Sequence, residues 1–239
     1  MIYALLFAAD AVFAVLFIKA GYPESTKKGF VFKMFASCIF LITGIYSASP
    51  PGCGRYSYLI IAALCAGLIG DIFLTFDPFI RDKSNKKKSA FFVLLGGLFF
   101  IAGHGIYIAA FAGELKKGGA FRLPVFLAGA ALAFVSVFAL IFISKVKPGK
   151  ALAAIAVYAA AISCMFAMGL CLALGGEFPS NAARVFLIAA PLLFIISDSS
   201  LLLKAFDKER FDNLAVRSVN LGTYYLAQML FAVTAGLIK

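Results

Sequence analysis

Eight runs of mostly apolar residues, each about as long as a bilayer-crossing helix, follow one another along this chain. A helix needs about 20 consecutive apolar residues to cross the roughly 30 Å hydrocarbon core of a bilayer. The connections between the runs are short, so no second domain fits outside the membrane. We therefore expect an all-α polytopic membrane protein, a single transmembrane helical domain over residues 1–239. Its eight helices are predicted at 2–18, 30–48, 58–76, 90–112, 123–144, 151–174, 182–203 and 216–238.

The composition excludes a soluble protein. Hydrophobic residues make up 63% of the chain and charged residues 14%, whereas soluble domains have about 45–50% and about 25%. A soluble domain has no interior large enough for so many apolar side chains. The chain has one histidine, so it cannot supply several histidine ligands to a zinc ion. We expect no metal and no cofactor.

The basic residues predict the orientation in the membrane. Lysine and arginine are enriched in the cytoplasmic loops of membrane proteins, so the net charge of +11 does not indicate a nucleic-acid partner. With eight spans, 16 of the 22 basic residues fall on one side of the membrane, in and beside loops such as 77–89 and 204–215. We therefore expect those loops to be cytoplasmic, both termini to be extracytoplasmic, and the protein to be a multi-pass protein of the cell membrane.

Three aspartates lie inside the apolar runs, where an ionisable group usually marks a functional site, and Asp71 and Asp198 are the two candidates. Asp71 in the third run and Asp198 in the seventh each lie about five residues from the cytoplasmic end of their span. Because these spans run in the same direction, the two carboxyl groups lie at nearly the same depth. We expect them to face one cavity if the spans are neighbours, with Ser197 beside Asp198. The alternatives are a packing face and a buried ion pair.

A polar stripe marks the eighth run. Its members are spaced by three or four residues and so share one helical face, which cannot face lipid: Arg217, Asn220, Tyr224 and Gln228. We expect this stripe to line the cavity, and the alternative is interhelical hydrogen bonding. Lys33 enters the second run at the same depth, with Ser37 one turn further in. The alternative for Lys33 is that it extends to the membrane surface.

Three further polar residues are candidates for the site. His104 and Tyr107 lie on one face of the fourth run, and Tyr158 lies in the sixth. For each, the alternative is ordinary packing inside the bundle.

The order of these motifs resembles the YhhN-like lysoplasmalogenases, a family of eight-helix membrane hydrolases. The motifs are Gly70-Asp71-x-x-Leu74, then Gly96, Phe100, His104 and Tyr107 in the fourth run, Tyr158, Phe194-x-x-Ser197-Asp198-x-x-Leu201, and Tyr224-Tyr225-Leu226-Ala227-Gln228. The similarity covers nearly the whole chain. One departure is that Lys33 precedes Met34, whereas the family often has Lys-Pro.

The resemblance implies hydrolysis of the vinyl ether bond of a lysoplasmalogen. The products would be a fatty aldehyde and glycerophosphoethanolamine or glycerophosphocholine. The partners would be the lysophospholipid substrate and membrane lipids. The residues implied to bind substrate or support the site are Lys33, His104, Tyr107, Tyr158, Ser197, Asn220, Tyr224 and Gln228.

The chemistry of a vinyl ether requires a proton donor and a negative charge. Protonation of the β-carbon gives an oxocarbenium ion, which water captures as a hemiacetal that collapses to the aldehyde. Two carboxyl groups in unequal environments supply both roles, so we expect Asp71 and Asp198 to be catalytic. We expect Asp71, among small and apolar neighbours, to be protonated. We expect Asp198, among serines, to be ionised. The substrate phosphate would meet Lys33 or Arg217.

Two other classes of protein fit the sequence. A small proton-coupled transporter would also use paired membrane aspartates, and the short Asp-x-x-Leu repeat in the third and seventh runs suits a duplicated carrier. It would need a water path to both faces. A non-catalytic lipid-binding membrane protein would instead have its aspartates bridged to Lys33 and Arg217.

Overall fold

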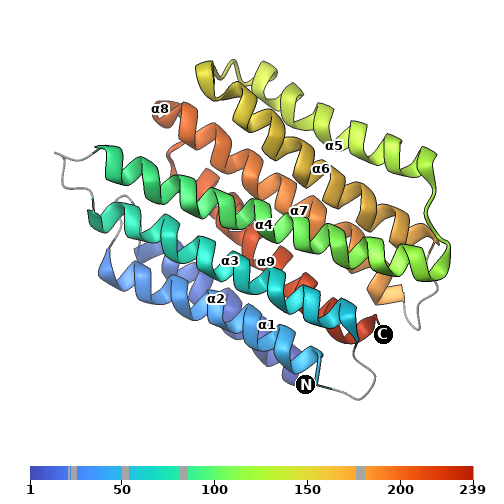
Figure 1. The fold of residues 1–239 in the computed structure, drawn as a ribbon. Helices are drawn as coiled ribbons and strands as arrows, with labels where there is room; N and C mark the ends of the chain where they lie inside the picture. The colour runs from blue at the N-terminus through green and yellow to red at the C-terminus, as the bar shows by residue number, and fades with distance from the viewer. Residues whose placement is uncertain (21, 23–25, 50–53, 81–85, 176–180, 239) are drawn as a thin grey trace.

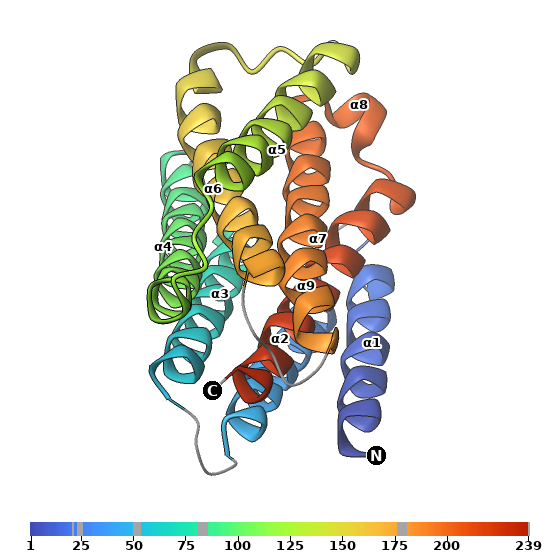
Figure 2. The same ribbon diagram turned by 90° about the vertical axis from the view of Figure 1, so that its right-hand side faces the viewer.

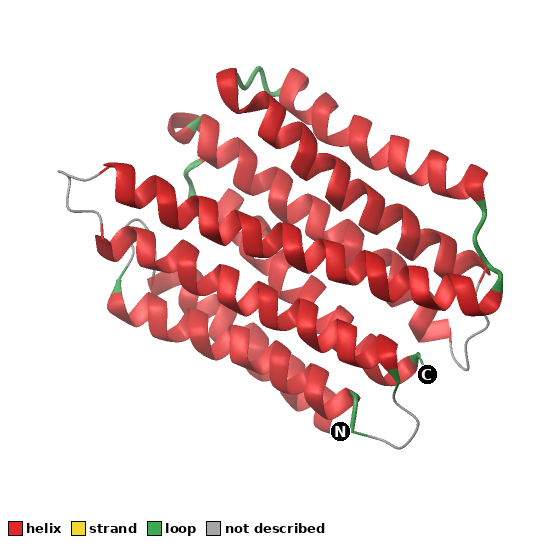
Figure 3. Ribbon diagram, viewed as in Figure 1, coloured by secondary structure: helices red, strands yellow, loops and turns green. Residues whose placement is uncertain are grey.

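The computed structural model describes residues 1–20, 22, 26–49, 54–80, 86–175 and 181–238, and every long element in them is a helix (Figures 1 and 3). Each predicted span coincides with one long helix. The helices are α1 (Ile2–Ala20), α2 (Lys27–Ser47), α3 (Arg55–Ile80), α4 (Lys86–Gly118), α5 (Leu123–Ile143), α6 (Leu152–Gly175), α7 (Asn181–Phe206), the short α8 (Lys208–Phe211) and α9 (Leu214–Leu237), with a 3-10 turn at Gly149–Ala151.

Seven of the described helices, α1 to α7, are long and apolar enough to cross a membrane, as in a multi-pass membrane protein. Helix α9, which corresponds to the eighth predicted span, is 24 residues long but is not among the seven. Its polar stripe lowers its hydropathy. Both termini lie at the same end of the bundle (Figures 1 and 2), as an even number of crossings requires. The eighth crossing and the membrane face of the termini stay predictions.

Helix α9 occupies the interior of the bundle. It packs against α1, α2, α3 and α7, and Figure 2 shows it between these helices. Most of its residues from Tyr224 to Ala235 are buried. The long helix that is absent from the seven apolar ones of the described residues is therefore shielded by its neighbours, because its polar side chains need partners that lipid cannot provide. This confirms that the stripe faces the bundle interior.

The register of α6 against α7 is fixed by a close contact. Pro191 has no N–H, so the carbonyl of Leu187 lacks its helical partner. Gly169 of α6 packs directly on that carbonyl, and a Cβ at position 169 would lie 2.5 Å from the carbonyl oxygen. Eleven residues, three helical turns, separate Gly169 from Tyr158 and also Leu187 from Asp198. The two helices run antiparallel, so the contact that requires Gly169 also brings Tyr158 level with Asp198.

Candidate functional site

Asp71 on α3 is surrounded by donors from two other helices. Lys33 Nζ on α2 lies 3.0 Å from its Oδ1. The Ser37 hydroxyl on α2 and the Tyr224 hydroxyl on α9 each donate to its Oδ2 at 2.7 Å. The Asp71 side chain is 3% exposed and that of Lys33 is 8% exposed. The ammonium and the two hydroxyl donors give both oxygens of this buried carboxyl group a polar partner. We call these four residues the Asp71 cluster.

A directed hydrogen-bond chain extends the Asp71 cluster toward α4. The Tyr107 hydroxyl donates to Gln228 Oε1 at 2.9 Å, and Gln228 Nε2 donates to the Tyr224 hydroxyl at 3.3 Å. Tyr224 in turn donates to Asp71. Gly67 of α3 makes room for this chain, because a Cβ at that position would overlap Gln228 Nε2. The amide of Gln228 therefore has one orientation, set by Tyr107 on one side and Tyr224 on the other.

Asp198 on α7 belongs to a second cluster, with Tyr158 and His104. The Tyr158 hydroxyl on α6 donates to Asp198 Oδ2 at 2.7 Å. His104 Nε2 on α4 lies 3.1 Å from that hydroxyl and 3.8 Å from Asp198 Oδ2. The Asp198 side chain is 18% exposed, and no lysine or arginine in the described part of the chain pairs with it. We call these three residues the Asp198 cluster.

Aromatic rings separate the two clusters. The Phe194 ring lies 4.8 Å from the His104 ring and 5.5 Å from the Tyr224 ring, measured between centroids. Helices α3 and α7 are not among the packed pairs in the described residues, whereas α9 packs against both. The prediction that Asp71 and Asp198 face one cavity is therefore wrong. It assumed that their helices are neighbours, and the polar helix α9 takes that position instead.

A narrow hollow nevertheless touches both the Asp198 cluster and the hydrogen-bond chain that leads to the Asp71 cluster. It has about 160 Å³ of empty space and in this conformation admits no water-sized group. His104 lines it from the Asp198 cluster, and Tyr107 and Gln228 line it from the hydrogen-bond chain. Its remaining walls are Ala63, Gly67, Phe100, Gly103 and Phe194. A substrate therefore enters this space only when lining side chains move.

The other predicted residues tie helices together beside the clusters. Asn220 Nδ2 on α9 donates to the Ser197 carbonyl at 2.8 Å and to its hydroxyl at 3.1 Å. The side chain of Arg217, one turn earlier on α9, does not reach Asp198. Its guanidinium carbon lies 5.0 Å from the centroid of the Phe17 ring on α1. Lys33 Nζ lies 5.7 Å from the same ring.

The contacts of Phe17 and the burial of Asp10, both on α1, could not be predicted from the sequence. Phe17 lies in an apolar run, and its contact with two cations depends on where α1 packs. Asp10 on α1 carried no sequence-based prediction, because no polar residue shares its helical face. It is 4% exposed, and its Oδ1 has no hydrogen-bond partner among the described residues.

The fold and the two clusters define a helical membrane protein that keeps hydrogen-bonded carboxyl groups inside its bundle. The profile of the YhhN family matches residues 28–235, and the chain belongs to that family. No curated protein and no solved structure matches the chain. The match confirms the resemblance drawn from the motifs, and it covers every residue of both clusters.

Proposed function

We propose that this protein is a membrane-embedded hydrolase that cleaves the vinyl ether bond of lysoplasmalogens. The substrate and one water would give a fatty aldehyde and glycerophosphoethanolamine or glycerophosphocholine. Membership of the YhhN family supports a hydrolase of this kind. The observation that carries the proposal is the Asp198 cluster. Its partly exposed carboxyl group lies beside an imidazole and a phenol, and no lysine or arginine of the described residues pairs with it.

In the proposed reaction the Asp198 cluster supplies the proton. A carboxyl group that no lysine or arginine neutralises can carry a proton inside a bundle. Asp198 would deliver this proton to the β-carbon of the vinyl ether. The carboxylate left behind then stabilises the oxocarbenium ion. Water adds to the carbon that bears the ether oxygen, and the hemiacetal collapses to aldehyde and alcohol. His104 is placed to return a proton to Asp198 through Tyr158.

Asp71 has a different part in this proposal. It is paired with Lys33, so it is unsuited to donate a proton. This reverses the roles expected from the sequence, which assigned the proton to Asp71. Asp71 would instead act through Tyr224 to orient Gln228. Gln228 and Tyr107 would then hold the attacking water or the glycerol hydroxyl.

The phosphate of the substrate is assigned to Arg217. Lys33 is already occupied by Asp71, whereas Arg217 Nε is buried without a hydrogen-bond partner in the described residues. Asn220 bonds to Ser197, the neighbour of Asp198, so Arg217 lies about one turn, roughly 5 Å, further along α9. The phosphate of a lysolipid lies at a comparable separation from its vinyl ether.

A direct assay tests the proposed reaction. Purified protein in neutral detergent receives a lysoplasmalogen or the 1-acyl lysolipid with the same headgroup and chain length. We expect fatty aldehyde from the first and no fatty acid from the second. Fatty acid release would identify an ordinary ester hydrolase. Absence of both products from folded protein would reject the enzyme.

One observation favours a second candidate, a non-catalytic lipid-binding protein. That alternative predicts that lysine bridges the buried aspartate, and Lys33 does bridge Asp71. It also predicts a bridge from Asp198 to Arg217, which the structure does not have. The same assay separates the two, because a lipid-binding protein would retain the lysoplasmalogen unchanged.

A further inference from the structure

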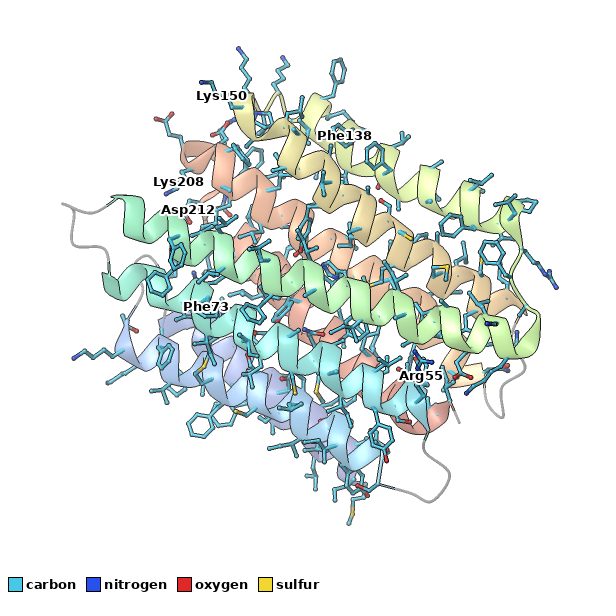
Figure 4. All side chains as sticks on the ribbon, viewed as in Figure 1. Arg55, Phe73, Phe138, Lys150, Lys208 and Asp212 are labelled. Atoms are coloured by element: carbon cyan, nitrogen blue, oxygen red, sulfur yellow. The ribbon has the colours of Figure 1, made fainter. Side chains whose placement is uncertain are left out.

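A second and larger hollow lies at the other end of the bundle, where α3 begins and α4 ends. Its volume is about 380 Å³, within the roughly 300–1,000 Å³ of typical ligand pockets. Figure 4 shows Arg55 at this end of the bundle, whereas Lys150, Lys208 and Asp212 lie at the other end. Arg55, Lys116 and Lys117 line its rim, and Tyr56 and Leu59 form part of its wall.

The rim carries positive charge that the protein itself does not neutralise. Glu114 also lines the hollow, and its carboxylate accepts a hydrogen bond from Lys117 Nζ at 2.7 Å. The Glu114 side chain is 11% exposed. This leaves Arg55 and Lys116, which form no ion pair in the described ranges. The two cations come from different helices and meet at one concave surface.

This hollow is separate from the candidate active site. Glu114 follows His104 by ten residues on α4, about 15 Å at 1.5 Å per residue. Arg55 precedes Asp71 by sixteen residues on α3, about 24 Å by the same measure. A lysolipid whose headgroup lay here could not place its vinyl ether beside Asp198.

The position and chemistry of the rim indicate a phosphate. Arg55 begins one apolar helix and Lys116 lies in the last turn of the next, so both lie near the level at which a bilayer carries its headgroups. Arginine and lysine together suit a phosphate oxyanion, which accepts paired hydrogen bonds from a guanidinium. We propose that this hollow binds a phosphate group, carried by a membrane lipid or free in solution, independently of the proposed hydrolase site.

Thermal unfolding of the whole protein in neutral detergent tests this site. The probes are dihexanoylphosphatidic acid, inorganic phosphate, and dihexanoylglycerol, which lacks the phosphate. We expect the midpoint of unfolding to rise saturably with a phosphate-bearing probe and not with dihexanoylglycerol. A rise with phosphatidic acid alone identifies a lipid ligand, and an equal rise with inorganic phosphate identifies the free ion. No rise with either phosphate probe would reject the site.

A matched pair of variants separates a site from general charge attraction. Arg55→Gln/Lys116→Gln removes the unpaired rim cations, and Lys147→Gln/Lys150→Gln removes two exposed cations from the other end. Charged hydrogen bonds contribute about 1.5–3 kcal/mol each, so we expect the rim variant to need at least about tenfold more probe for half of the shift. The control should behave like wild type. Equal losses in both variants would overturn the proposal. Aldehyde release should be unchanged in both variants, because neither pair of residues belongs to the proposed hydrolase site. The result for the phosphate site is therefore independent of the proposed hydrolase activity.

Discussion

Asp71 and Asp198 have opposite surroundings within one bundle. Asp71 is held by an ammonium and two hydroxyl donors and is nearly sealed from solvent. Asp198 has one phenol donor, a nearby imidazole and a partly open surface. Asp71 has polar partners on both of its oxygens, whereas the contacts of Asp198 in the described residues are all on Oδ2. Partners from neighbouring helices, and not depth in the membrane, therefore distinguish Asp71 from the carboxyl group that we propose as the proton donor.

The largest effect is expected from Asp198→Asn. An amide cannot deliver the proton, and general acid catalysis contributes about 10²–10⁴-fold, so aldehyde release should fall by that factor. The fold should remain, because Asn can still accept the hydrogen bond from Tyr158. The control is Glu209→Gln, which alters an exposed carboxylate on α8. Near-normal turnover of folded Asp198→Asn would remove Asp198 from the mechanism.

Asp71→Asn should chiefly affect stability. The substitution leaves the Lys33 ammonium buried without its counter-ion, and breaking a buried pair in this way costs about 3–5 kcal/mol. Unfolding by denaturant in detergent measures the loss. Lys33→Met combined with Asp71→Asn should recover most of it, and failure of that rescue would mean that the ion pair is not the cause.

Gly67→Ala tests the chain that links the Asp71 cluster to the hollow. The new methyl group displaces Gln228 and lies 3.5 Å from the Tyr224 hydroxyl, and overpacking of this kind costs about 1–3 kcal/mol. Turnover should fall together with stability. Gly97→Ala is the control, because a Cβ there meets no atom within 4 Å. If both variants behave alike, the orientation of Gln228 has no functional role.

The smallest effect is expected at an aspartate outside the membrane. Asp207 accepts hydrogen bonds from the side chain and the backbone N–H of Arg210, and these lower its pKa below the ordinary value of 3.8. Its contribution to stability is therefore present above that ordinary pKa and is lost as the pH falls through the lowered pKa. The free energy of unfolding is measured for wild type and Asp207→Asn from neutral pH down to this acidic range. The two values should differ slightly at neutral pH and converge as the pH falls. A difference that grows in acid would contradict this assignment.

The helices could be predicted from the sequence because bilayer thickness sets their length and the apolar runs mark their positions. The polar stripe of α9 also predicted its burial, since Tyr224 and Gln228 cannot face lipid. The pairing of clusters could not be predicted. Asp71 and Asp198 match in depth along the sequence. Nothing in their local sequence shows that Ser37 of α2 would reach Asp71 or that Tyr158 of α6 would reach Asp198. Those contacts depend on which helices are neighbours, and this is a property of the whole bundle.

The central position of α9 has a consequence for biosynthesis. This helix is translated after α1 to α7, and its stripe makes it a poor candidate to enter lipid without partners. If α9 forms the predicted eighth crossing, its insertion is coupled to docking against helices that are already in the membrane. Tyr224 and Gln228 lie on α9, so the hydrogen-bond chain to Asp71 is completed only when α9 docks. A nascent chain that stalls before α9 would hold Lys33 and Asp71 in the bilayer but could not yet have a formed site.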